Sequence, residues 1–332
     1  MPDQWELYDL TDDPIEAVNR WDDPGALAVF DYLRGTLAAE RLALVPERND
    51  PWPYASTTGP VRPLRRSAPP PARALRKVLQ RVGLHPDDVA PARFDLAGRR
   101  ALVIATNHGT LDVGKPTGVF ASEMTVPYYG FLDAGMDVDV ASPEGGIIPV
   151  DPLSVKPVIR TAEDDRFLAD DDLRNKVTHS LPIADLDMDD YDLVFLAGGW
   201  GAAFDFAMSQ PLADAVTAAN AADCVIGGVC HGPLGMVNAV DRDGSPLVAG
   251  RHVTAVTDKQ VHELGIASTP YHPESALRDA GADFEGRSAR RDVLANHWVV
   301  DGNLVTGQNQ NAGPMVAREM MTLLAERQTS DP

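Results

Sequence analysis

Residues 224–235 read Cys-Val-Ile-Gly-Gly-Val-Cys-His-Gly-Pro-Leu-Gly, an apolar run that passes through small residues into a turn at Cys230. This order is typical of a nucleophile elbow, in which a strand bends sharply into a helix and holds a reactive side chain at the C-terminal edge of a sheet. Repeated glycine adds nothing to the packing of a core strand, so the glycines around Cys230 favour a reactive site over a buried structural thiol. Cys224 has no such context and is predicted to be structural.

Two neighbouring features complete the predicted elbow. A helix is expected over residues 231–240, and its N-terminal end would favour the thiolate form of Cys230. The glycine-rich turn at 196–201, Leu-Ala-Gly-Gly-Trp-Gly, ends the preceding apolar run at the same sheet edge. We expect the N–H groups of Gly199 and His231 to form an oxyanion hole.

A carboxyl group is a candidate partner for the thiol. Glu123 stands among apolar neighbours in the first turns of a helix predicted over residues 118–134. Burial raises the pKa of such a carboxyl, which allows it to share a proton with Cys230 and to act as acid or base near neutral pH. The alternative is a glutamate that only stabilises the helix N-terminus. Position alone does not decide between the two.

The pattern from Arg99 onward predicts the fold. Short apolar runs bounded by Gly, Pro or Asp predict buried parallel strands at 100–105, 137–141, 192–197 and 224–229. The stretches between them are long enough for helices, predicted at 118–134, 163–177, 211–222, 231–240, 273–280 and 313–327. A hairpin is predicted around Asp301-Gly302. The fold class is α/β: a doubly wound, mostly parallel sheet with helices on both faces.

The N-terminal part differs from the rest of the chain in amino-acid composition. We predict an extension at 1–95, consisting of a helix, a Pro-rich strap and a basic helix, followed by a catalytic domain at 96–330. Seven basic residues and no acidic one fall between Val61 and Arg81. This basic run is interpreted as an arm that lies on its own acidic protein, with an anion or partner site as the alternative.

Composition excludes several classes of protein. The chain has 332 residues, 44% of them hydrophobic, and a formal net charge of -20. This charge disfavours binding to nucleic acid and to anionic membranes. No apolar run approaches the roughly 18 residues that cross a bilayer, and no secretory signal is visible, so a cytoplasmic location is expected. Two cysteines are too few for a disulfide framework.

These motifs, taken together, resemble the ThiJ/PfpI superfamily, whose fold is similar to that of the class I glutamine amidotransferases. The resemblance covers residues 99–327 and runs in the same order throughout. It is carried by the elbow and by residues 118–123 (GVFASE), 137–146 (DVDVASPEGG), 191–201 (YDLVFLAGGWG) and 301–309 (DGNLVTGQN). The elbow with an upstream helix glutamate is most similar to the heat-shock branch, which includes glutathione-independent glyoxalase (glyoxalase III) and holding chaperones.

The resemblance implies roles for particular residues. Cys230 would be the nucleophile, His231 its neighbouring base and Glu123 the acid against the thiol. An acidic residue about thirty positions after the cysteine would orient the histidine, and Asp258 is the first choice, with Glu263 next. A different alignment places Val261 in that column and leaves His231 without a carboxylate partner.

The resemblance also bears on cofactors and assembly. Leu132 occupies the position where some relatives have a metal-binding histidine, so no catalytic metal is expected. No cofactor is expected either. The superfamily's members are usually dimeric, which predicts a homodimer.

One motif suggests a different family. Residues 271–274 read Tyr-His-Pro-Glu and are similar to the His-Pro-Glu of glutamine amidotransferases. The motif lies much closer to the cysteine here and lacks their preceding Gly-x-Gln. Pro273 followed by Glu274 is common at the start of a helix, which is the interpretation preferred here.

The predicted function is cofactor-free and cysteine-dependent. The substrate would be a small reactive carbonyl compound, converted as in glyoxalase III from a 2-oxoaldehyde to a 2-hydroxy acid, or handled by a related deglycase reaction. One alternative is a PfpI-type cysteine peptidase or amidase. Another is a non-enzymatic role, as a holding chaperone or a thiol oxidation sensor.

Overall fold

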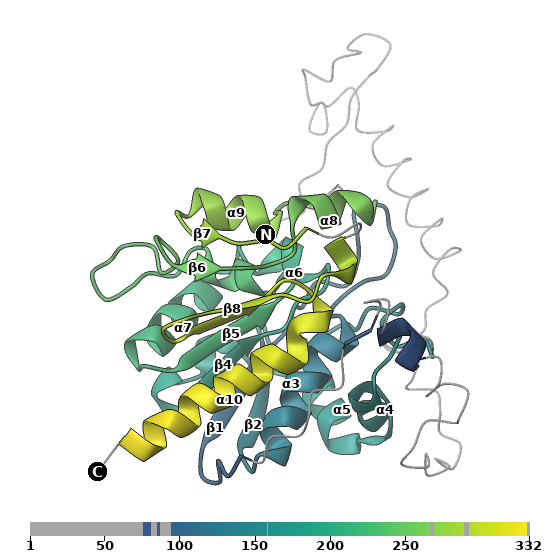
Figure 1. The fold of residues 1–332 in the computed structure, drawn as a ribbon. Coiled ribbons are helices and arrows are strands. Elements are labelled where there is room, and N and C mark those ends of the chain that lie inside the picture. Colours follow the sequence, from purple (N-terminus) through teal and green to yellow (C-terminus); the bar gives the residue numbers. More distant parts are fainter. Residues whose placement is uncertain are drawn as a thin grey trace, which may run out of the picture. The chain divides into compact units, whose positions relative to one another are not determined.

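A seven-stranded sheet forms the centre of the fold (Figure 1). The computed structural model describes residues 76–80, 85–86, 94–157, 159–265, 269–288 and 292–330. The strands are β1 (Arg100–Ile104), β2 (Asp137–Ser142), β3 (Leu181–Pro182), β4 (Leu193–Leu196), β5 (Val225–Val229), β8 (Trp298–Asp301) and β9 (Leu304–Gly307). Their order is β3-β2-β1-β4-β5-β9-β8, and all neighbours are parallel except β8 and β9. The predicted α/β class and mostly parallel sheet are confirmed.

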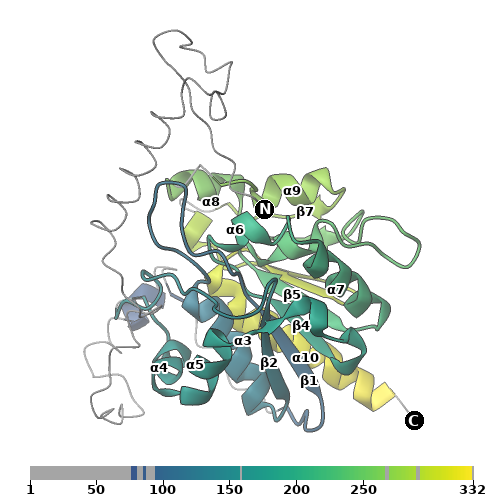
Figure 2. The same cartoon turned by 180° about the vertical axis from the view of Figure 1, so that it is seen from behind.

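Helices cover both faces of this sheet. Helices α3 (Ala121–Asp133) and α10 (Gly313–Ser330) lie together on one face, in front in Figure 1. Helix α7 (Gln210–Ala221) lies on the other face, in front in Figure 2. The remaining helices are α4 (Ala162–Ala169), α5 (Asp171–Thr178), α6 (Ala202–Asp205), α8 (Asp258–Glu263) and α9 (Pro273–Asp279). A two-stranded parallel sheet pairs β6 (His252–Val253) with β7 (Asp283–Phe284).

Five short 3-10 helices complete the described elements. They are η1 (Ile183–Asp185), η2 (Met188–Asp190), η3 (Gly232–Met236), η4 (Asp292–Leu294) and η5 (Gln310–Ala312). Most of the short elements, including α6, α8, β3, β6 and β7, were not predicted. Elements of two to six residues are too short to show a hydrophobic period.

The central strands are apolar along their whole length because both faces are covered. Every residue of β4 and of β5 is buried. The two strands are parallel, with Leu196 of β4 opposite Gly228 of β5, so they end at the same edge of the sheet. This register brings the turn after β4 beside the turn after β5, and thus places Gly198 and Gly199 next to Cys230.

The predicted helix at 163–177 is in fact two helices, α4 and α5. Asp170 separates them with an extended backbone, and its carboxylate accepts hydrogen bonds from the N–H groups of Asp172 and Leu173. A side chain that caps a new helix start competes with continuation of the old helix, which explains the break. Thr161 and Asp164 form a reciprocal capping box at the start of α4.

The predicted helix at 231–240 is also wrong, since only η3 forms there. Glycine and proline at 232, 233 and 235 have low helix propensity, which accounts for a single tight turn in place of an α-helix. The hairpin prediction is confirmed, with Asp301 opposite Leu304 in the antiparallel pair β8–β9.

The chain divides into two units, residues 1–62 and 63–332. The first unit lies outside the described residues, as do the predicted N-terminal helix and most of the Pro-rich strap, so the boundary at residue 95 stays a prediction. Arg76, from the basic run, donates a hydrogen bond of 2.7 Å to Asp165 on α4 and also bonds to the Thr161 carbonyl. This contact supports an arm that lies on its own acidic protein.

None of the helices in the described part of the chain combines the length and the apolar character that a bilayer crossing requires.

Candidate active site

Cys230 sits on a strained backbone at the end of β5. Its φ of 59° lies in the left-handed region, which is uncommon for a residue with a side chain. Hydrogen bonds hold the bend on both sides: the Cys230 N–H donates to the Gly307 carbonyl at 3.0 Å, and the Cys230 carbonyl accepts from the Val256 N–H at 3.0 Å. The thiol is 8% exposed. Strain of this kind, held by the surrounding structure, is typical of a functional residue.

Glu123, in the first turn of α3, meets the Cys230 thiol. The side chain is fully buried, and its carboxyl lies close enough to the thiol and to the Gly198 N–H for both to lower its pKa. Burial raises the pKa of Glu123 to about 8, and the negative charge of buried Asp151 adds to the rise. The interactions with the thiol and with the Gly198 N–H lower the pKa of Glu123, but burial raises it by more. Glu123 therefore holds a proton at neutral pH and can give it up in the range where a catalytic acid or base works best.

The thiol has a raised pKa, contrary to the expectation of a stabilised thiolate. Burial is the main cause, and the adjacent Glu123 carboxylate adds to it, so the pKa of Cys230 lies well above its ordinary value. The short η3 offers no long helix dipole. The backbone N–H groups of Gly199 and His231 point at the sulfur and partly offset the rise. The protonation of the thiol and that of the carboxyl therefore depend on each other, and the two groups titrate as a coupled pair.

His231 follows directly and reaches back to the sulfur. Its Nδ1 lies 3.3 Å from Cys230 Sγ, and its ring packs on Trp200 with 4.7 Å between the centroids. The side chain is 2% exposed. Burial lowers the pKa of His231 to about 3, and the proximity of the His272 imidazole adds to the lowering. His231 is therefore a neutral imidazole that can pass a proton on but does not keep one.

The expected carboxylate partner of His231 is not in contact with it. Asp258 accepts a hydrogen bond from Ser275 Oγ at 2.5 Å, and its Oδ1 lies 3.8 Å from His272 Nδ1. Glu263 accepts from the Asp292 N–H at 2.8 Å. Among the described residues, no hydrogen bond joins either carboxylate to His231, and its Nε2 has no partner. The role assigned to Asp258 stays a prediction.

Val261 stands where the alternative alignment placed it. The side chain is fully buried and belongs to a small apolar cluster with Cys230 and Val256, against which Trp200 packs. An apolar residue thus occupies the side of the site from which α8 approaches. This explains why the Nε2 atom of His231 lacks a carboxylate.

The turn after β4 fits the site only because it contains glycine. A Cβ atom on Gly198 would lie 2.5 Å from Glu123 Oε2 and 2.7 Å from the His231 nitrogen. Gly199 has a φ of +111°, and its Cβ would lie 2.4 Å from the Gly118 carbonyl oxygen. The close approach lets the Gly198 and Gly199 amides reach the carboxyl and the sulfur.

Replacing Gly198 with alanine is expected to lower both stability and activity. The added methyl group collides with Glu123 and with the backbone at His231, so the free energy of unfolding should fall by about 1–3 kcal/mol. Chemical denaturation and an activity assay measure the two effects. Gly313→Ala, where no atom lies within 4 Å of the new Cβ, is the matched control. A Gly198→Ala protein with native stability and rate would contradict the proposed contact.

Three residues that contribute to the site were given no role in the sequence analysis. Asp151 raises the pKa of Glu123, and its carboxylate accepts a hydrogen bond of 3.0 Å from Thr117 Oγ1. Trp200 stacks on His231, and His272 lies close enough to act on the charge of that ring. Two of the signals stood in quoted motifs: Trp200 lies in the turn at 196–201, and His272 was interpreted only as part of a helix start. Asp151 lies outside every quoted motif.

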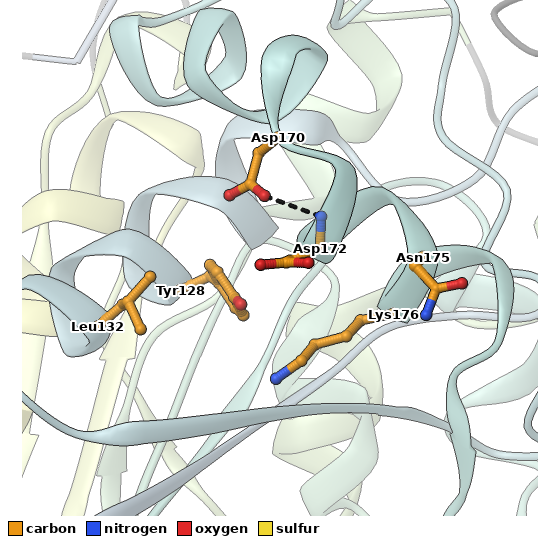
Figure 3. Close-up of a pocket in the computed structure, with 6 residues that line it drawn as sticks. All are labelled: Tyr128, Leu132, Asp170, Asp172, Asn175 and Lys176. Atoms are coloured by element: carbon orange, nitrogen blue, oxygen red, sulfur yellow. Dashed lines mark hydrogen bonds between the residues drawn. The ribbon is translucent and has the colours of Figure 1, made fainter.

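A separate surface pocket lies between α3 and α5 (Figure 3). Its lining residues are Tyr128, Leu132, Asp170, Asp172, Asn175 and Lys176, none of which belongs to the elbow. Asp170 is occupied in capping α5, as the dashed line in Figure 3 shows. Among the described residues, no group of three His, Cys, Asp or Glu side chains is arranged to hold a metal ion.

Comparison with known proteins identifies the family. The family model described as "DJ-1/PfpI family" matches residues 116–323. The chain is 30% identical over 215 residues to glyoxalase 3 of Candida albicans, covering 63% of this chain and 90% of that protein. It is 31% identical over 239 residues to the glutathione-independent glyoxalase hsp3101 of Schizosaccharomyces pombe, covering 67% of this chain and 92% of the relative.

A solved structure agrees with these sequence relatives. The crystal structure of glyoxalase III from Candida albicans has a TM-score of 0.60 and 26% identity, covering 68% of this chain and 97% of that one. The residues matched by the family model, 116–323, include the elbow and the helix that carries Glu123. The protein therefore belongs to the DJ-1/PfpI family.

Proposed function

We propose that this protein is a glutathione-independent glyoxalase that converts a small 2-oxoaldehyde, such as methylglyoxal, into a 2-hydroxy acid. The observation that carries the proposal is the buried Cys230–Glu123 pair, in which a nucleophile and a proton donor of raised pKa are in direct contact. The two similar proteins from Candida albicans and Schizosaccharomyces pombe, which are named as glyoxalases, support it. No cofactor takes part in the proposed reaction.

In the first step Cys230 adds to the aldehyde carbon. The sulfur forms a bond to that carbon, the thiol proton passes to the Glu123 carboxylate, and the carbonyl oxygen gains the negative charge. The N–H groups of Gly199 and His231, which interact with the sulfur, would bind this oxygen. Glu123 returns this proton to the oxygen, which gives a hemithioacetal and leaves Glu123 as a carboxylate.

In the second step a proton moves between the two substrate carbons. A base removes the hydrogen from the sulfur-bearing carbon to give an enediol, and protonation of the neighbouring carbon yields a thioester. Glu123 is the better base of the two candidates, because a group with a pKa of about 8 can both take and return a proton. His231, with a pKa of about 3, does not retain a proton long enough to return it.

In the last step water hydrolyses the thioester. Water adds to the acyl carbon, the carbon–sulfur bond breaks, and the product leaves as a 2-hydroxy acid. The sulfur regains its proton. In this proposal the partner of the protein is a small carbonyl substrate, and neither nucleic acid nor a membrane takes part in the reaction.

The test is a glutathione-free assay of methylglyoxal with the full-length protein in D2O, with lactate detected by proton NMR. The enediol route predicts lactate that carries solvent deuterium at the second carbon. Glu123 can return its proton before it exchanges with solvent, so lactate without that deuterium contradicts the proposed base only if Glu123→Gln forms it at the native rate, which would indicate a direct hydride shift. A complete absence of lactate would overturn the proposed function and favour peptidase, chaperone or thiol-sensor assays.

We further propose that the enzyme is a cytoplasmic homodimer. The net charge of -20 supports a freely diffusing protein, because it repels nucleic acid and anionic lipid surfaces. Analytical ultracentrifugation of the full-length protein and fractionation of its source cells test the two statements separately. A monomer at micromolar concentration, or recovery with the membrane fraction, would contradict the respective statement.

A further inference from the structure

Hydrolysis of the thioester needs a proton acceptor that His231 alone does not provide. Its Nδ1 faces Cys230, and its buried Nε2 has no hydrogen-bond partner among the described residues. A histidine in such a site usually passes charge to a carboxylate on its second nitrogen. Here the position that α8 presents to the Cys230 cluster is Val261. The site therefore contains a base with an open second nitrogen.

A second histidine–carboxylate pair lies at the same end of the molecule. Helix α9 packs against η3, which directly follows His231, and α8 packs against α9 (Figure 1). His272 is the residue immediately before α9, and Asp258 is the first residue of α8. Their side chains meet with 3.8 Å between His272 Nδ1 and Asp258 Oδ1. The electrostatic effect of His272 reaches the ring of His231.

The surroundings of this pair hold it in place. Ser275 Oγ donates to Asp258 Oδ2, and the Asp258 N–H donates to Glu274 Oε2 at 3.0 Å. Glu274 is in turn paired with Arg278 at 2.9 Å. The His272 side chain is 32% exposed, so a proton that it receives can leave to solvent.

We propose that the His272–Asp258 pair is the proton relay of this site and serves the hydrolysis of the Cys230 thioester, an inference that rests on the proposed function. As water adds to the acyl carbon, one of its protons passes to His231 Nδ1, the nitrogen that faces the sulfur, while the proton on His231 Nε2 passes to His272. The carbon–sulfur bond breaks, and the sulfur takes a proton from Glu123, which has been reprotonated from solvent after the thioester formed, as its pKa of about 8 allows. The product acid and His272 then release their protons, which restores the free enzyme.

This arrangement gives Asp258 a positioning role through His272 in place of direct contact with His231. It also assigns a function to the His-Pro-Glu motif without an amidotransferase reaction. In this arrangement Pro273 starts α9, Glu274 anchors the first residue of α8, and His272 moves the proton.

Deacylation can be measured apart from glyoxalase activity. The full-length protein is acetylated at Cys230 with p-nitrophenyl acetate, and loss of the acetyl group is followed by intact-protein mass spectrometry. His272→Gln is expected to slow this loss about 10- to 100-fold relative to the native protein. Asp258→Asn should slow it less, and the double variant should be no slower than His272→Gln. Added imidazole should restore most of the rate in His272→Gly.

His262→Gln is the matched control, because His262 is an exposed histidine on the same helix as Asp258. It should deacylate at the native rate. Deacylation of His272→Gln at the native rate would overturn the relay, and so would a slow rate that imidazole does not restore. Absence of any acetylation would overturn both the relay and the nucleophile. If the native protein deacylates and the variants behave as expected, but methylglyoxal is not converted, only the proposed function is rejected.

Discussion

The Cys230→Ala variant is expected to lose methylglyoxal turnover, with a fall in kcat/KM by a factor of about 10³ or more. The reason is that no other thiol reaches the site. Cys224, the only other cysteine of the chain, directly precedes β5, at the opposite end from Cys230, and donates its S–H to the Tyr191 carbonyl at 2.9 Å. Without a covalent adduct the substrate has no hemithioacetal and therefore no acidic hydrogen to shift. Lactate formation by the two proteins, assayed side by side without glutathione, measures the effect.

Cys224→Ala is the matched control for this experiment. The thiol of Cys224 is buried, and its pKa is raised to about 12, mainly by burial, so it does not act as a nucleophile. Loss of its packing and hydrogen bond should reduce the free energy of unfolding by about 1 kcal/mol and leave the rate unchanged. Circular dichroism shows whether both variants keep the fold. Turnover that survives in a folded Cys230→Ala protein would reject the assignment of the nucleophile.

The Glu123→Gln variant is expected to lose about 10²- to 10⁴-fold in kcat/KM. Glutamine keeps the size of the side chain and its contact with Gly198, but it neither accepts nor returns a proton. In the native enzyme kcat/KM should rise as the pH approaches about 8, since the carboxylate form is the base that receives the thiol proton. The variant should lack this rise. A variant whose pH profile keeps the native shape would show that another group is the base.

The same carboxyl also links stability to pH. Its pKa is about 8 in the folded protein against an ordinary value of 4.5, so the folded state holds a proton that the unfolded chain has released. The free energy of unfolding should therefore decrease as the pH rises from about 4.5 to about 8. Glu123→Gln should show a smaller decrease over this window. Urea denaturation at a series of pH values measures the difference, and equal slopes for the two proteins would contradict the folded-state pKa.

Several features of the fold were predictable because they depend on neighbouring residues. Buried parallel strands need continuous apolar runs, and the runs at β1, β4 and β5 are of this kind. In β2 valine alternates with Asp137 and Asp139 before the strand becomes fully buried. The Asp301-Gly302 pair specifies a tight turn through its own backbone preferences. The elbow at Cys230 was recognisable for the same reason, because a sharp bend requires small residues on either side of it.

The helix predictions were wrong where a capping side chain or helix-breaking residues end a helix early. Asp170 caps α5 and breaks the helix expected over 163–177. Glycine and proline limit the helix after the elbow to η3. Both signals are visible in the sequence, but their effect depends on whether the surrounding chain supplies enough packing to override them.

The sequence by itself therefore determined the sheet, the elbow and the pair of residues, Cys230 and His231, that are adjacent in the chain. Only the tertiary structure decided what surrounds them. Packing of α3 buries Glu123 against the sulfur, and this burial sets the pKa values of both groups. Packing of α8 and α9 presents Val261 to Cys230 and joins Asp258 to His272. Such contacts join residues far apart in the chain, and local patterns carry no information about which side chains meet or how much water they exclude.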